Sequence, residues 1–192
     1  MRKLRVIEHI SLDGVIQQSV DPNFPYGDWK AWYRSPAGAE EILAAQGEKF
    51  DLLLGRRTYD IWSGSWPNAP QSTLGDRLNA ATKHVVTHRP KSLQWGPHDA
   101  IGPDFPGDVR RIKSQDGPPL ILWGSSTLTS TLLEHELVEE MLLIVYPVLL
   151  GTGKRLFAEG TTPRSFELVS TKAMPSGIIF SRYHLAGPLK TT

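Results

Sequence analysis

The stretch Leu120-Ile121-Leu122-Trp123-Gly124-Ser125-Ser126-Thr127-Leu128 decides how this chain folds. Its first four residues are apolar and follow two prolines, which is typical of a buried β-strand. The apolar run breaks at Gly124, and leucines then recur at helical spacing from Leu128 onward. The stretch therefore predicts a strand, a tight turn and the first turn of a helix.

The same junction is suited to a phosphate group. The first backbone N–H groups of a helix have no partner within it, and the macrodipole favours an anion there. Gly124 lets a ligand approach the backbone, and Ser125, Ser126 and Thr127 can donate hydrogen bonds. Ser and Thr are also common N-caps and Gly is common in turns, so an ordinary helix start fits the stretch as well.

Strands and helices alternate on both sides of this junction. The predicted strands are residues 4–10, 51–55, 83–87, 120–123, 141–145, 165–173 and 178–184; the predicted helices are residues 37–50, 73–81, 107–115 and those that start after Gly55 and Gly124. The last two strands are joined by Pro175-Ser176-Gly177 and predict a hairpin. We expect a mostly parallel α/β sheet with antiparallel edge strands, in a single domain over residues 1–192.

Two segments predict loops. Residues 92–106 look irregular apart from Ala100-Ile101. Residues 21–36 mix proline, glycine and aromatic side chains and predict a long ordered loop, either a lid or a surface loop pinned by its aromatics. Ligands of such α/β sheets bind at the glycine-marked loops that follow the carboxyl ends of the strands.

The composition narrows the class of protein. The chain has 192 residues, of which 40% are hydrophobic and 21% charged, an ordinary globular balance. A net charge of +1 gives no electrostatic case for nucleic acid or a membrane as partner. The absence of cysteine excludes disulfides and thiolate chemistry and is compatible with a reducing cytoplasm, which is the expected location.

Five motifs occur in an order that matches a known family. They are Ser11-Leu12-Asp13-Gly14, Leu54-Gly55-Arg56-Arg57-Thr58-Tyr59, Trp123-Gly124-Ser125-Ser126-Thr127-Leu128, Leu137-Val138-Glu139-Glu140 and Pro147-Val148-Leu149-Leu150-Gly151-Thr152-Gly153. Together they resemble the dihydrofolate reductase-like superfamily, in the branch of the reductase domain of the bifunctional riboflavin-biosynthesis enzyme. The resemblance spans nearly the whole chain. It implies a three-layer αβα fold with a central mixed, mostly parallel sheet of about eight strands, NADPH as cofactor, and often a dimer.

The resemblance also implies three contacts to the cofactor. Gly55, Arg56, Arg57 and Thr58 would hold a phosphate; Thr87, His88 and Arg89 would flank the adenosine ribose and its 2′-phosphate; Gly124, Ser125, Ser126, Thr127 and Leu128 would hold the pyrophosphate. The guanidinium forks of Arg57 and Arg89 suit a phosphate dianion. Arginine in a first helical turn opposes the helix dipole unless an anion is near, although a solvated helix start also accommodates it.

The substrate side departs from the known branches. Trp123 stands where the riboflavin branch has an acidic residue that contacts substrate, and the tryptophan–proline–acid motif of dihydrofolate reductases has no clean copy. We assign Trp123 and Asp13 to the substrate side, with Asp13 as the expected catalytic acid because it leaves the first strand in a loop that family members fold over the nicotinamide. An Asx role in the turn Asp13-Gly14 is the ordinary alternative.

These features predict an NADPH-dependent reductase that transfers a hydride to a small heterocyclic or carbonyl substrate. The alternative is a non-catalytic NADPH- or nucleotide-binding protein that has lost the substrate site, and Trp123 favours it. No metal site is expected, because His84 and His88 fall on a predicted strand, which separates them too widely for a zinc pair. A homodimer is expected, because residues 141–145, 166–169 and 178–180 offer more apolar surface than one small sheet covers.

Overall fold

The computed structural model describes residues 1–18 and 24–190. The part of the predicted loop at residues 21–23 lies outside these residues. The strands are β1 (Leu4–Ile10), β2 (Asp51–Gly55), β3 (Lys83–Val86), β4 (His98–Ile101), β5 (Leu120–Trp123), β6 (Glu140–Val145), β7 (Arg164–Ala173) and β8 (Ile179–Pro188). The helices are α1 (Pro36–Gln46), α2 (Arg56–Ser65), α3 (Thr73–Ala80), α4 (Phe105–Ser114) and α5 (Ser126–Glu134), with short 3-10 turns η1 (Ala31–Tyr33), η2 (Trp66–Asn68) and η3 (Pro90–Ser92).

All eight strands join one sheet in the order β4-β3-β2-β5-β1-β6-β8-β7. The pairs from β4 to β6 are parallel, whereas β8 runs antiparallel to both β6 and β7. This is the mixed, mostly parallel sheet with a C-terminal antiparallel hairpin that the sequence predicted. The central strands are buried on both faces, which explains their continuous apolar sequences.

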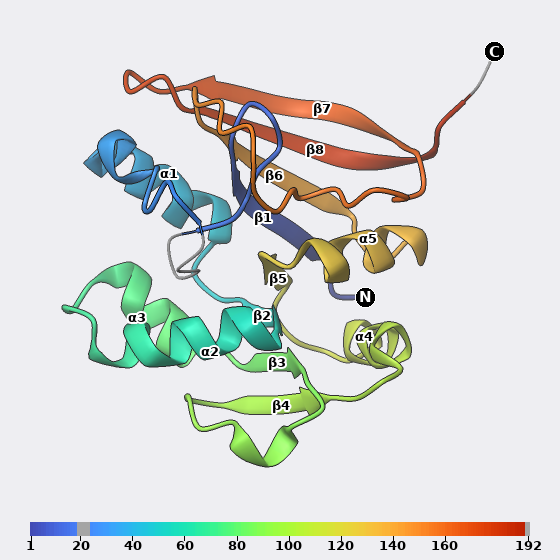
Figure 1. Cartoon of the computed structure of the whole chain (residues 1–192). Coiled ribbons are helices and arrows are strands. Elements are labelled where there is room, and N and C mark those ends of the chain that lie inside the picture. Colours follow the sequence, from blue (N-terminus) through green and yellow to red (C-terminus); the bar gives the residue numbers. More distant parts are fainter. Residues whose placement is uncertain (19–23, 191–192) are drawn as a thin grey trace.

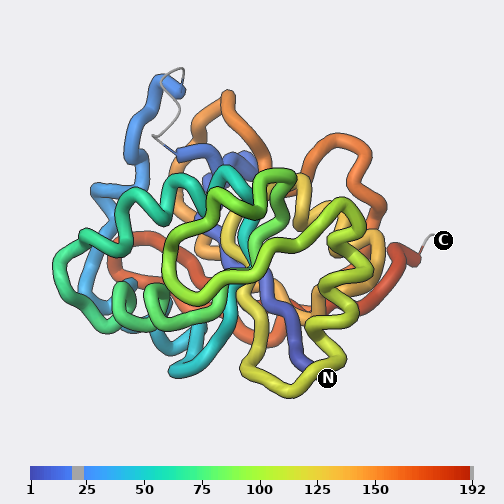
Figure 2. The backbone as a smooth tube through the Cα atoms, turned by 90° about the horizontal axis from the view of Figure 1, so that it is seen from below, coloured from blue at the N-terminus to red at the C-terminus, as the bar shows by residue number. Residues whose placement is uncertain are grey.

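Helices cover the two faces of the sheet and make three layers (Figure 1). One apolar cluster joins one face to α1, α2 and α3 and contains Ala45, Tyr59 and Leu78. A second joins the opposite face to α4 and α5 and contains Val109 and Leu132. In Figure 2 the molecule is seen from the β4 edge of the sheet, and the segment that follows β3 runs across the front of the view.

Some boundaries differ from those predicted. The segment predicted as irregular contains β4, whose residues His98 to Ala100 are exposed, so no hydrophobic pattern marks this edge strand. Helix α4 starts before the predicted residue 107 because the carboxylate of Asp104 accepts a hydrogen bond from the Gly107 N–H at 3.2 Å. Helix α1 ends at Gln46, before the predicted residue 50, because Gly47 adopts a positive φ of 80°.

The topology brings the two strand-to-helix junctions together. Strands β2 and β5 are parallel neighbours, so their carboxyl ends lie at the same edge of the sheet. The approach is close enough to favour glycine at Gly55, because a Cβ there would lie 3.1 Å from the Ser125 hydroxyl oxygen. Strand β1 is the next neighbour of β5, so residues near its end reach the same edge.

The apolar strands from which the homodimer was predicted differ in their exposure. Most of β6 is buried within the sheet, so it does not contribute to an outer surface. Leu168, Val169 and Ile179 on β7 and β8 are exposed. The homodimer stays a prediction that rests on these exposed side chains.

Candidate functional site

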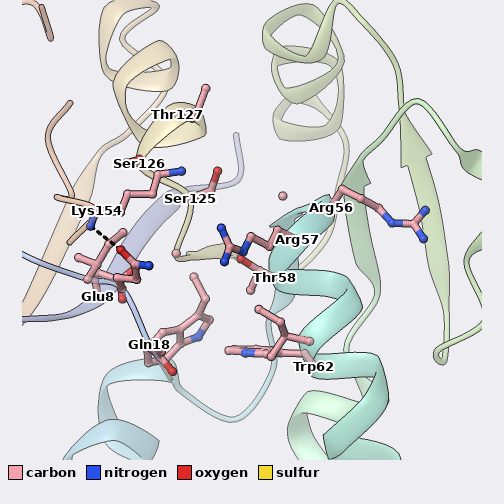
Figure 3. A pocket seen from close by; sticks show the side chains of 16 residues that line it. Glu8, Gln18, Arg56, Arg57, Thr58, Trp62, Ser125, Ser126, Thr127 and Lys154 are labelled. Atoms are coloured by element: carbon pink, nitrogen blue, oxygen red, sulfur yellow. Dashed lines mark hydrogen bonds between the residues drawn. The ribbon is translucent and has the colours of Figure 1, made fainter. Parts of the chain in front are cut away.

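A pocket of about 500 Å³ lies at the carboxyl edge of the sheet. It is lined by Glu8, Ile16, Gln17, Gln18, Gly55, Arg56, Arg57, Thr58, Ile61, Trp62, Trp123, Gly124, Ser125, Ser126, Thr127 and Lys154. These residues come from the end of β1 and the segment after it, from the end of β5, from the starts of α2 and α5, and from the loop after β6 (Figure 3). Both predicted phosphate junctions therefore face one cavity.

Positively charged side chains and the first backbone N–H groups of two helices line the pocket. Helices α2 and α5 both begin at its wall, and their first N–H groups carry partial positive charge. Figure 3 shows the Arg57 side chain extending between the two helix starts. The Lys154 side chain, which the sequence-based prediction missed, comes from the opposite wall and reaches toward α5 in the same view. An anion can thus be contacted from both sides.

The turn into α5 is strained. Gly124 has φ 68° and Ser125 has φ 65°, so two successive residues are left-handed, and the second is not glycine. A Cβ on Gly124 would lie 3.1 Å from the Thr58 hydroxyl oxygen. The Ser125 hydroxyl accepts a hydrogen bond from the Leu128 N–H at 3.4 Å and caps the helix. Strain of this kind is typical of ligand-binding turns. Leu128 itself packs beneath the turn and does not line the pocket.

Arg56 holds the neighbouring loop in place. Its guanidinium donates to Asp60 at 2.8 Å, to the carbonyl of Arg89 at 3.1 Å and to Ser92 at 2.6 Å, with Thr87 at 3.4 Å. In Figure 3 the Arg56 side chain points away from the pocket, unlike that of Arg57. The predicted phosphate ligand Arg56 therefore ties the 87–92 segment to α2.

The residues predicted to flank the 2′-phosphate lie beside the pocket lining. Thr87 is buried, and its hydroxyl accepts a hydrogen bond from the Arg89 N–H at 3.0 Å. The Arg89 side chain is 67% exposed and approaches Asp60 at 3.4 Å, and His88 is exposed. This segment is placed at the rim near the start of α2, where it can reach a ligand that extends out of the pocket.

Asp13 lies in a contact between two loops. Its carboxylate accepts hydrogen bonds from the Ser11 hydroxyl at 2.7 Å, the Leu150 N–H at 3.2 Å and the Gly151 N–H at 2.9 Å. These donors, the Ser11 hydroxyl first, lower the pKa of Asp13. The carboxylate belongs to the turn rather than to the lining of the pocket. Its predicted catalytic role stays a prediction.

Glu8 is the pocket acid that the sequence-based prediction missed. It lies near the end of β1 and is 2% exposed. Burial raises the pKa of Glu8 to about 7, against the opposing effects of Lys30 and of the amides of His9 and Gly124. Its one signal in the sequence is a glutamate between the apolar Val6 and Ile10 on one face of the strand, which is costly unless the carboxyl is paired, protonated or used.

Trp123 lies in an aromatic cluster at the pocket. Its ring stacks on His9 with centroids 5.5 Å apart, and Trp62 follows at 6.0 Å. His9 Nδ1 is 2.9 Å from the Tyr146 hydroxyl, and burial lowers the pKa of His9 well below its ordinary value. The cluster gives the pocket flat apolar faces next to the Glu8 carboxyl, as expected for a site that takes a planar ring.

Two further features bear on the predicted partners. Within residues 1–18 and 24–190, no group of three or more His, Asp or Glu side chains is arranged to hold a metal ion. Nor does any helix in this part of the chain have the length and apolar character to cross a membrane.

The sheet topology and the paired junctions define a class: α/β proteins with the dihydrofolate reductase-like fold and a pocket at the carboxyl edge of the sheet. Within this class, the chain belongs to the family of the RibD C-terminal domain, whose model matches residues 2–180. The family resemblance inferred from the five motifs is thereby confirmed.

Three similar proteins illustrate the relationship. The uncharacterized protein YyaP of Bacillus subtilis (strain 168) is 26% identical over 140 residues, which cover 71% of this chain and 74% of YyaP. A pyrimidine reductase-like protein from Corynebacterium diphtheriae superposes with a TM-score of 0.64 at 14% identity, over 99% of this chain and 93% of its own. Dihydrofolate reductase from Enterococcus faecalis, complexed with NADP(H), gives 0.62 at 13% identity over 96% of both chains. The two structures show a shared fold.

Proposed function

We propose that this protein is an NADPH-dependent reductase that transfers a hydride to a small heterocyclic or carbonyl substrate. The observation that carries the proposal is the pairing of two helix starts across one pocket, at Gly55–Thr58 and Gly124–Thr127. The RibD C-terminal domain family and the NADP(H) complex of the similarly folded dihydrofolate reductase support it. A cytoplasmic location and a homodimer are part of the same proposal.

The residues present fit a dinucleotide. Its pyrophosphate needs N–H donors, hydroxyl groups and positive charge, and the pocket offers the starts of α2 and α5, Ser126 and Thr127, and the cations Arg57 and Lys154. The strained turn at Gly124 allows the close approach that a phosphate requires. The 2′-phosphate would extend to Arg89 at the rim, where Arg56 holds the loop.

The cofactor, when bound, supplies the hydride. The contribution of the chain is to bind and orient both reactants and to provide a proton. Trp62 and Trp123 line the pocket and offer flat faces against which a planar ring can stack. The apolar cluster around them excludes water from the reacting atoms, which strengthens polar contacts there.

A binding and turnover assay tests the proposal. NADPH and NADH are titrated into the protein with a fluorescence readout, and oxidation is then followed by NADPH absorbance with a panel of pterin, pyrimidine and small carbonyl acceptors. We expect NADPH to bind more tightly than NADH and at least one acceptor to be reduced. Tight NADPH binding without turnover on any acceptor would favour the non-catalytic alternative. No binding of either dinucleotide would contradict both.

A further inference from the structure

The Glu8 carboxyl has one oxygen in use and one oxygen free. Oε1 accepts a hydrogen bond from the His9 N–H at 3.0 Å. Oε2 is buried and makes no hydrogen bond of ordinary geometry among the described residues, although the Gly124 amide is close enough to act on the carboxyl and lower its pKa. A buried carboxyl oxygen without a partner is costly, and native structures retain such groups where they serve a ligand or a reaction.

Glu8 is positioned at the base of the proposed cofactor and substrate pocket. It lines that pocket together with Thr58 and Trp123. A Cβ built on Gly124 would lie 3.7 Å from Glu8 Oε2 and 3.1 Å from the Thr58 hydroxyl, so the free oxygen stands directly beside the turn. Trp123 Nε1 is also buried without a partner among the residues described. A donor and an acceptor are thus left unpaired at one pocket.

Burial keeps the proton of Glu8 available near neutral pH, against the charge of Lys30, which lowers the pKa of Glu8. Lys30, from the segment before η1, is the charged side chain that acts most strongly on it, and burial lowers the pKa of Lys30 to about 8. Asp28, before η1, and Arg34, directly after it, act on Lys30. The neighbouring His9, and Arg57 and Lys154 on the pocket walls, are further titratable or charged groups that the structure describes on this side.

We propose that Glu8 is the catalytic acid of this pocket and donates the proton to the substrate heteroatom as the hydride arrives. This inference rests on the proposed reductase function. In the step, the cofactor, when bound, would supply the hydride and be oxidised, so that a C–H bond forms at the carbon of the substrate C=N or C=O bond. The π electron pair moves to the nitrogen or oxygen, which forms a bond to the proton as the O–H bond of Glu8 breaks. Solvent then returns a proton to the carboxylate.

The geometry also defines the class of acceptor. The heteroatom of the reducible bond must reach Glu8 Oε2, and the rest of the molecule must lie against Trp123 and Trp62. A planar heterocycle with a C=N bond, or a carbonyl conjugated to such a ring, satisfies both requirements. Asp13 differs from Glu8 in its surroundings, because three donors engage its carboxylate in a loop contact, outside the pocket lining.

The test combines turnover with a measurement on the protein alone. Glu8→Gln, Glu8→Asp and the exposed control Glu48→Gln are compared for folding, for NADPH affinity, and for reduction of an accepted substrate between pH 5 and 9. The Glu8 carboxyl carbon is titrated by ¹³C NMR, assigned by its absence in Glu8→Gln. We expect Glu8→Gln to lose about 100- to 10,000-fold in kcat while NADPH affinity changes less than about threefold.

The wild-type rate should fall as pH rises through the pKa of Glu8, and the same midpoint should appear in the NMR titration. Glu8→Asp should keep this limb, and Lys30→Met should move it to higher pH, because Lys30 lowers the pKa of Glu8. A Glu8→Gln variant with the wild-type rate and pH profile, or an NMR midpoint near 4, would overturn the role of Glu8 alone. A wild-type protein that binds NADPH but reduces no acceptor would overturn the proposed function, and this inference with it. If Glu8→Gln does not fold, the midpoint of the NMR titration and the pH profiles of Glu8→Asp and Lys30→Met still decide whether Glu8 is the proton donor.

Discussion

The two edges of the parallel sheet treat buried charge in opposite ways. At the amino ends of the strands, Arg2 pairs with Asp51, Arg5 with Glu140 and Lys113 with Glu139. At the carboxyl ends, Glu8 keeps an oxygen without a partner among the residues that the structure describes. At the first edge these three pairs join opposite charges, and breaking one of them would leave a buried charge uncompensated, whereas the second edge keeps a polar group available to a ligand.

The pKa values follow the same division. Burial works to raise the pKa of Asp51, but His84 and Arg2 outweigh it and lower the pKa. The pKa of Glu140 is also lowered, because the effects of Arg5 and Lys3 outweigh that of burial. At Glu8 burial prevails and raises the pKa. One polypeptide thus holds buried carboxyl groups ionised at one edge and a carboxyl group protonated up to about neutral pH at the other.

The largest expected effect comes from breaking a pair at the amino edge. Asp51→Asn removes the charge that faces the buried Arg2, and an uncompensated buried charge costs about 3–5 kcal/mol. Urea denaturation at pH 7 should show this loss in the free energy of unfolding. Lys172→Met, which breaks the exposed pair with Glu41, is the control and should change it by less than about 1 kcal/mol. Equal losses of stability in the two variants would contradict the distinction between the buried pair and the exposed pair.

Glu8→Gln should change the free energy of unfolding in the opposite direction, towards greater stability. A folded-state pKa raised from 4.5 to about 7 means that the native state holds its proton more tightly than the unfolded state. Wild-type stability from this group is complete below pH 4.5 and is lost as pH rises through about 7. The variant cannot ionise, so at pH 8 it should be more stable than wild type by up to roughly 3 kcal/mol. Denaturation at pH 4 and pH 8 measures the difference, which should nearly vanish at pH 4.

Gly124→Ala tests the strain at the carboxyl edge. A side chain at φ 68° costs about 1–2 kcal/mol, and its Cβ would crowd the Thr58 hydroxyl at 3.1 Å. Gly151→Ala is the matched control, because Gly151 has φ 74° and no neighbour within 4 Å of the added Cβ. Both variants should lose stability on thermal melting, but only Gly124→Ala should lose NADPH affinity, by about tenfold or more. Gly124→Val should abolish binding. Unchanged affinity in Gly124→Ala would remove this turn from the site.

The smallest expected effect is at the rim. Arg89→Ala removes an exposed cation whose pair with Asp60 contributes under about 1 kcal/mol to stability. A charge-assisted contact to the 2′-phosphate is worth about 1.5–3 kcal/mol, so at this exposed position NADPH affinity should fall about tenfold. NADH, which lacks that phosphate, should bind as before. Titration of the wild type and the variant with both cofactors measures these affinities. Equal losses of affinity for NADPH and NADH would place Arg89 outside the site.

The sequence by itself determined the sheet, most of its elements and the two junctions. Continuous apolar runs mark β2, β5 and β6 because both faces of a central strand are buried, and glycine marks the turns that follow β2 and β5. These signals are local, since each depends on a few adjacent residues. Strand β4 lacked such a signal, because an exposed edge strand carries no hydrophobic pattern.

Only the tertiary structure decided which polar residues face the pocket and in what state. Arg56 and Arg57 are adjacent in sequence and look equivalent, yet one ties down the 87–92 loop and the other extends into the cavity. Asp13 and Glu8 lie five residues apart. The donors of a distant loop engage Asp13, whereas Glu8 Oε2 is buried without a hydrogen-bond partner in the part of the chain that the structure describes. Hydrogen-bond partners and burial are supplied by segments far apart in the chain, so the charge state of a carboxyl group is a property of the folded molecule.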